Sequence, residues 1–156
     1  MSVPPAHQGM IDPDVDRVAG RPLSLRGRYL YVVFSGGMLG TLTRWAVSQW
    51  LPTHDGWPWA TLAVNLAGAF ALGLLLEMLV RHGLDRGWPR LARLHFGTGF
   101  LGAFTTYSAL AVESMLLADA GRRWLAAGYL GVSVVCGQLL AFAGIAAGIW
   151  LDGRRS

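Results

Sequence analysis

The chain has 156 residues, of which 53% are hydrophobic and only 14% are charged, and its formal net charge is +4. Because ordinary soluble domains have about 25% charged residues, this composition excludes a water-soluble core and favours a membrane protein. All 13 basic residues are arginines. These arginines flank apolar segments without forming a basic stripe, so nucleic-acid binding is not expected.

Four apolar segments are long enough to cross a bilayer, which requires about 20 residues for each helix. They cover residues 29–51, 59–80, 94–118 and 124–151. The sequence therefore predicts an all-α, polytopic membrane protein with one four-helix transmembrane domain over residues 29–151. Residues 1–28, which contain several prolines and aspartates, are expected to form a disordered N-terminal tail, and residues 152–156 a short C-terminal tail.

The arginines are distributed unevenly between the two sides of the predicted domain. With four spans, both tails and the loop after the second span lie on one side. That side holds ten arginines, whereas the opposite side holds only Arg122 and Arg123. The remaining arginine, Arg44, falls inside the first span. By the positive-inside rule, we expect a multi-pass protein of the plasma membrane with both termini in the cytoplasm.

The first span combines closely spaced glycines with a charged side chain. Gly36, Gly37 and Gly40 would let another helix approach the backbone, so we expect a packing contact there. Arg44 lies about two turns from the outer end of the span, and a central arginine costs about 2.5–3.5 kcal/mol to insert. Two interpretations remain open: Arg44 extends to the interface as an anchor, or it faces an aqueous vestibule that attracts anions.

Polar and small residues share one face of the second span. Thr61, Asn65, Gly68 and Leu72 follow the helical period. A carboxamide that is buried in the membrane needs a partner. Asn65 therefore has two possible uses. Its amide bonds to a neighbouring helix, or its N–H groups bind a partly dehydrated anion without carrying a charge.

The third span contains an interruption at its centre. Gly99 and Gly102 each weaken a helix by roughly 1 kcal/mol against alanine, and the hydroxyls of Thr105, Thr106 and Ser108 offer the backbone competing hydrogen bonds. In hydrocarbon, a broken backbone persists only where protein or a wet cavity satisfies its polar groups. We therefore predict a third helix broken at mid-membrane, a pattern typical of ion and substrate sites, with a half-helix that begins near Thr105. The alternative is a continuous helix with small residues at a packing face.

The fourth span has a polar stripe and, further along, a glycine pair. Tyr129, Ser133 and Gly137 recur every four residues and place two hydroxyls on one face. Gly144 and Gly148 form a G-x-x-x-G pair, which predicts a packing contact near the inner end of the span.

Three motifs together resemble the bacterial fluoride channel family (Fluc/CrcB). They are the glycine-rich first span with its arginine, Val64-Asn65-x-x-Gly68 in the second span, and Gly99-Phe100-x-Gly102-x-x-Thr105-Thr106-Tyr107-Ser108 in the third. The resemblance covers nearly all of residues 30–151. It implies a passive channel that exports cytoplasmic fluoride, built as an antiparallel dimer of two four-helix subunits with two pores. It also implies a sodium ion at the dimer centre, held by backbone carbonyls that match Gly102 and Thr105.

The same resemblance implies an ion pathway lined by polar side chains. The family has a pore asparagine, a vestibule arginine and a polar track, and the matching positions here are Asn65, Arg44, Tyr129, Ser133, Glu113, Thr106 and Ser108. Fluoride holds its water tightly, so a selective pore must replace that hydration with several fixed donors, and neutral amide and hydroxyl groups are suitable. The ring of Tyr107 can add a contact through its positive edge.

The chain departs from the family pattern just after the break. Where the family usually has two phenylalanines with a threonine before the second, this sequence has Tyr107, Ala109 and Leu110. One aromatic position is therefore missing. This departure and the uneven arginines leave open a homodimer, or a heterodimer with an oppositely inserted homologous subunit. They also leave open a non-conducting structural or regulatory subunit.

Two further classes of function have less support from the residues. A small-molecule exporter would share the small-residue helices but usually has a larger apolar cavity. An enzyme is not expected, because the sequence contains no nucleophile–base pair, metal cluster or paired acids, and Glu113 stands alone. No organic cofactor is expected either.

Overall fold

The computed structural model describes residues 27–51, 56–80 and 87–153. Within these ranges the chain is helical and contains no β-strand, which confirms the expected all-α fold. The elements are α1 (Gly27–Trp50), α2 (Trp59–Val80), α3 (Trp88–Ala92), the π-helix η2 (Arg93–Leu101), α4 (Gly102–Phe104), α5 (Tyr107–Asp119) and α6 (Arg123–Gly153). Nearly all of the tail expected over residues 1–28 lies outside the described residues.

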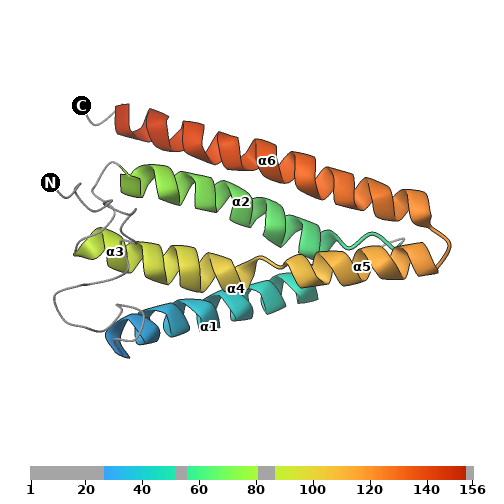
Figure 1. Cartoon of the computed structure of the whole chain (residues 1–156), viewed down its shortest axis with the longest axis horizontal. Coiled ribbons are helices and arrows are strands. Elements are labelled where there is room, and N and C mark those ends of the chain that lie inside the picture. The colour runs from blue at the N-terminus through green and yellow to red at the C-terminus, as the bar shows by residue number, and fades with distance from the viewer. Residues whose placement is uncertain (1–26, 52–55, 81–86, 154–156) are drawn as a thin grey trace, which may run out of the picture.

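The long helices lie roughly along one common axis, which is horizontal in Figure 1, and successive spans run in opposite directions. The start of α1, the end of α2, the start of α3 and the end of α6 all lie at the left of the view. Arg28, Arg90 and Arg93 therefore belong to one end of the molecule, and Arg122 and Arg123 belong to the other. Among the described residues, these arginines are thus sorted between the two ends as the sequence predicted.

Three helical segments of the described chain are long and apolar enough to cross a membrane, namely Trp59–Val80, Trp88–Asp119 and Arg123–Gly153. The first helix, α1, has 24 residues and would extend over about 36 Å, but it carries Arg28 and Arg44. Large apolar side chains such as Phe34, Leu139 and Phe142 are exposed on the outside. Together with the three apolar segments, this exposure identifies a multi-pass membrane protein.

Glycines allow α1 to lie directly against the first half of the third span. A Cβ at Gly36 would overlap the carbonyl oxygen of His95, and one at Gly40 would overlap that of Phe100. From the other side, a Cβ at Gly99 would lie only 2.6 Å from the carbonyl oxygen of Val33. The predicted packing role of the first-span glycines is therefore confirmed at Gly36 and Gly40.

Glycines also allow α6 to lie directly against α2. A Cβ at Gly144 would overlap the carbonyl oxygen of Phe70, and one at Gly148 would lie 2.8 Å from Cγ of Glu77. The packing contact predicted for this glycine pair is confirmed, and its partner is α2. Because α2 packs along α6 while α1 packs along η2 and α4, two close helix pairs form the framework of the domain.

The third span is interrupted at its centre, as the sequence predicted. Thr105 has φ −80° and ψ 159°, and Thr106 has φ −151° and ψ 121°, so both residues are extended. The half-helix predicted to begin near Thr105 starts at Tyr107, with Thr106 as its N-cap. Before the break the span packs on α1, and after it α5 packs on α6. The extended residues therefore allow the span to change neighbours.

The beginning of the third span differs from the prediction. The sequence indicated a loop up to residue 93, but the helical structure already starts at Trp88, with Gly87 as N-cap at φ 64° and a proline in the first turn. Proline favours the first turn of a helix, because its missing N–H is not needed there. Residues Arg93–Leu101 then form a π-helix, an uncommon conformation often found at functional sites.

Candidate functional site: the break in the third span

Asn65 forms two hydrogen bonds with the broken backbone. Its side-chain Nδ2 donates to the carbonyl oxygen of Thr106 at 2.9 Å, and the Thr106 amide donates to Oδ1 of Asn65 at 2.8 Å. The sequence left open whether Asn65 joins helices or binds an anion. The structure shows the first use. The carboxamide has two N–H groups, and these two bonds use only one of them.

The hydroxyls of the break are used in two different ways. Thr106 Oγ1 accepts a hydrogen bond from the Ala109 amide at 3.2 Å and lies 3.2 Å from Ser108 Oγ. Thr105 Oγ1 instead donates to the carbonyl oxygen of Leu101 at 2.9 Å. One threonine therefore begins the second half-helix, and the other ends the first.

The methyl group of Thr105 occupies the space above Gly68, where a Cβ would overlap it. Asn65 and Gly68 both lie on the same face of α2. This face therefore receives the two extended residues, one through hydrogen bonds and the other through a close van der Waals contact. The polar face that the sequence predicted in the second span is the surface against which the break is held.

Carbonyl groups at the break lose their helical donors, and those of Gly102 and Thr105 are two of them. In an α-helix, the amide of residue i+4 donates to the carbonyl of residue i. The Thr106 amide would serve Gly102 in this way, and the Ala109 amide would serve Thr105. Both amides are bound by side-chain oxygens instead. Main-chain oxygens of this kind are suitable ligands for a hard cation.

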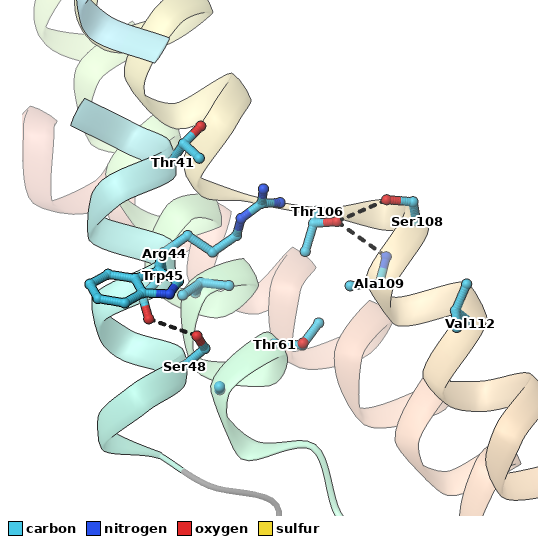
Figure 2. A pocket seen from close by; sticks show the side chains of 11 residues that line it. Thr41, Arg44, Trp45, Ser48, Thr61, Thr106, Ser108, Ala109 and Val112 are labelled. Atoms are coloured by element: carbon cyan, nitrogen blue, oxygen red, sulfur yellow. Dashed lines mark hydrogen bonds between the residues drawn. The ribbon is translucent and has the colours of Figure 1, made fainter. Parts of the chain in front are cut away.

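A pocket of about 560 Å³ opens between α1, α2 and α5. Arg44 is partly buried and lines it, and Figure 2 shows its side chain reaching from α1 toward Thr106 and the start of α5. This arrangement favours the vestibule interpretation of Arg44 over the interfacial anchor. The other polar side chains of the lining are Thr41, Ser48, Thr61, Thr106 and Ser108.

A groove lies on another side of the break and shares Thr106 with this pocket. Its polar lining includes Asn65, Thr105, Thr106, Tyr107 and Ser133. Tyr107 is 82% exposed in this chain, whereas the neighbouring Leu110 is buried in the core. Leu72 and Gly68 of the predicted second-span face also line the groove.

Glu113, which is itself half-buried, is the centre of a hydrogen-bonded group whose two donors are buried. Thr61 Oγ1 donates to its Oε1 at 2.7 Å, and the Tyr129 hydroxyl donates to its Oε2 at 2.8 Å. Tyr129 is completely buried, and Ser133 Oγ donates to the carbonyl oxygen of Tyr129 at 2.7 Å. The hydroxyl hydrogens of Tyr129 and Ser133 therefore point at protein acceptors. The sequence gave Thr61 no role of its own, although its position one turn before Asn65 was a usable signal.

The residues expected along the pathway thus fall into three groups around one point of the chain. The pocket contains Arg44 and Ser108, the groove contains Asn65, Tyr107 and Ser133, and the hydrogen-bonded group contains Glu113 and Tyr129. Thr106 lines both the pocket and the groove. The break in the third span is therefore the structural centre of the candidate site.

Comparison with known proteins gives consistent matches over this region. The family described as CrcB-like protein, Camphor Resistance (CrcB), matches residues 31–145. Fluoride-specific ion channel FluC 1 from Cutibacterium acnes is 51% identical over 126 residues, which cover 80% of this chain and 88% of that protein. FluC 2 from Leifsonia xyli subsp. xyli is 40% identical over 141 residues, which cover 90% and 97%. FluC from Bordetella petrii is 40% identical over 111 residues, which cover 71% and 84%.

Proposed function

Because this chain belongs to the CrcB-like protein family, we propose that it is a subunit of a fluoride-specific ion channel that lets cytoplasmic fluoride leave the cell passively. The observation that carries this proposal is the broken third span, which lies between a pocket containing an arginine and a groove containing neutral donors. A backbone interrupted inside the membrane is typical of ion sites.

The geometry supports distinct roles for the residues of the pathway. Arg44 attracts anions into the pocket, where its charge reaches toward Thr106 (Figure 2). Ser108 and the remaining N–H of Asn65 supply neutral donors near the break, and the exposed ring of Tyr107 supplies a positive edge and a hydroxyl. Fixed neutral donors of this kind can replace the water around fluoride without trapping it as a strong cation would.

The remaining polar-track residues contribute to the pathway through hydrogen bonds within the protein. The hydroxyls of Tyr129 and Thr61 donate to Glu113, and the Ser133 hydroxyl donates to a backbone carbonyl. These bonds keep the Glu113 carboxylate engaged with protein donors, so that it repels a passing anion less strongly.

A sodium ion is part of the proposal, and the residues at the break fit it. The carbonyl oxygens of Gly102 and Thr105 lose their helical donors because those amides bind Asn65 and Thr106. When bound at these carbonyl oxygens, the cation would supply positive charge to the break. Gly102 itself is exposed, so its carbonyl could be shared with a second subunit.

We also propose that the chain works as a dimer with an oppositely inserted homologous subunit. An apolar groove beside the break contains exposed Phe34, Met38 and Leu42 together with Gly102, and a partner would cover it. The bias of ten arginines to two indicates one fixed orientation for this chain. These features favour a heterodimer, and the burial of Leu110 in the core keeps a non-conducting subunit as the alternative function.

Reconstitution separates these alternatives. The purified chain, alone or co-purified with a homologous subunit, is placed in fluoride-loaded liposomes, and a fluoride electrode records efflux after a potassium ionophore is added. We expect fluoride efflux from the two-subunit preparation and none in matched chloride-loaded liposomes. Robust efflux from this chain alone would contradict the need for a partner. An inactive two-subunit preparation would contradict the channel itself.

A further inference from the structure

Two amides, one within the break and one in the first turn of α5, are bound by side chains instead of by the helix. The Thr106 amide donates to Asn65 Oδ1 at 2.8 Å, and the Ala109 amide donates to Thr106 Oγ1 at 3.2 Å. In a continuous α-helix these two amides would donate to the carbonyls of Gly102 and Thr105. Each of the two side-chain oxygens therefore competes with one backbone carbonyl for the same amide.

The local sequence alone has only a weak preference for this open conformation. Threonine lowers helix stability slightly through its branched side chain, and tertiary context commonly overrides such preferences. Closing the helix would give both amides a carbonyl partner, which strongly favours closure where water is scarce. A specific competitor for each amide is therefore needed to hold the break.

Asn65 is well placed to be that competitor, because it binds both sides of one residue. It accepts from the Thr106 amide and donates to the Thr106 carbonyl at 2.9 Å. One turn later on α2, Gly68 makes room for the side chain of Thr105. The two extended residues are therefore held by a single face of α2, in register with the carboxamide.

We infer that Asn65 and Thr106 are positioning residues that hold the third span open, so that the carbonyl oxygens of Gly102 and Thr105 face a cation instead of an amide. This inference rests on the cation role in the proposed function. It adds that the availability of these oxygens is set by two side chains, both of which also line the proposed anion pathway. A change at the anion pathway should therefore alter cation binding.

The test uses the full chain co-purified with its homologous subunit in detergent, and compares thermal unfolding in sodium and in N-methyl-D-glucamine. Thr106→Val keeps the branched shape but removes the hydroxyl, and Asn65→Leu keeps the approximate volume but removes both hydrogen bonds. Thr106→Ser retains the hydroxyl. Thr43→Val is a matched control, because its exposed hydroxyl donates only to Leu39 within α1. We expect sodium to stabilise the wild type, Thr106→Ser and Thr43→Val, but not Thr106→Val or Asn65→Leu. Full sodium stabilisation of both deficient variants would overturn the inference.

Hydrogen exchange gives a readout that does not depend on sodium. Loss of a capping side chain typically shifts a local equilibrium by about fivefold. Because the span is expected to close without its competitors, hydrogen exchange of the segment 105–110 should slow by about that factor in Thr106→Val and Asn65→Leu. It should remain unchanged in Thr106→Ser and Thr43→Val. If the wild type does not respond to sodium but these exchange changes occur, the cation role is wrong, whereas the positioning role of Asn65 and Thr106 is supported. Unchanged exchange in both deficient variants would refute the positioning role.

Discussion

Removing the hydroxyl of Tyr129 should destabilise the protein without changing its shape. In Tyr129→Phe the ring keeps its place in the core, but Glu113 loses the donor that lies 2.8 Å from Oε2. Tyr129 is completely buried, so bulk water cannot easily replace the missing hydroxyl. Thr61 still donates to the other carboxylate oxygen at 2.7 Å, so the carboxylate keeps one of its two hydroxyl donors.

The expected loss follows from the charge of the acceptor. A hydrogen bond to a charged group contributes about 1.5–3 kcal/mol, against about 1 kcal/mol for a neutral pair. We therefore expect the free energy of unfolding to fall by about 2 kcal/mol, which is roughly a 30-fold change in the unfolding equilibrium constant. Because the Tyr129 hydroxyl helps to keep the Glu113 carboxylate engaged with protein donors, its loss should make Glu113 repel a passing anion more strongly, and fluoride efflux should fall as well.

The measurement is reversible unfolding in mixed micelles, followed by tryptophan fluorescence as the proportion of dodecyl sulfate rises. Tyr31→Phe is the matched control, because Tyr31 is 72% exposed on α1 and should tolerate the change. Thr61→Val combined with Tyr129→Phe completes a double-mutant cycle, in which a coupling energy is expected because both hydroxyls bind one carboxylate. If Tyr129→Phe unfolds like Tyr31→Phe, the assigned importance of the hydrogen-bonded group is wrong.

Three further changes test the packing, the pocket and the groove. Gly144→Ala should destabilise the fold by about 1–3 kcal/mol through overpacking against α2, whereas Gly128→Ala on the same helix meets no atom within 4 Å and should be tolerated; equal unfolding curves would contradict the close α2–α6 contact. Arg44→Gln should slow fluoride efflux by about tenfold at low ionic strength and much less in high salt, and a salt-independent loss would argue against attraction of anions. Tyr107→Ala should reduce efflux yet leave unfolding unchanged, because the ring is exposed, and normal efflux would remove Tyr107 from the pathway.

The sequence was most informative where a local rule applies to neighbouring residues. Long apolar segments predicted the membrane helices, and glycines with clustered hydroxyls predicted the break at Thr105 and Thr106. The glycines at residues 36, 40, 144 and 148 were correctly predicted as contacts, because a missing side chain has few other uses in a helix. The π-helix before the break was not predicted, since its hydrogen bonds reach one residue further without a distinct pattern of residue types.

The roles of individual polar side chains depended on partners far away in the sequence. Asn65 binds a residue 41 positions later, and Thr61 binds one 52 positions later. A carboxamide can serve a backbone, another side chain or an ion equally well, so its residue type could not select among them.

What the sequence by itself determined is therefore the apolar segments that form the long helices, the place where one of them is interrupted, and the small residues at which helices meet. What only the tertiary structure decided is that Asn65 holds the interrupted backbone, that the side chain of Arg44 lines a pocket, and that Glu113 accepts hydrogen bonds from two hydroxyls. The physical reason is that periodicity fixes which residues share a face of a helix, whereas hydrogen-bond partners depend on which helix lies opposite that face.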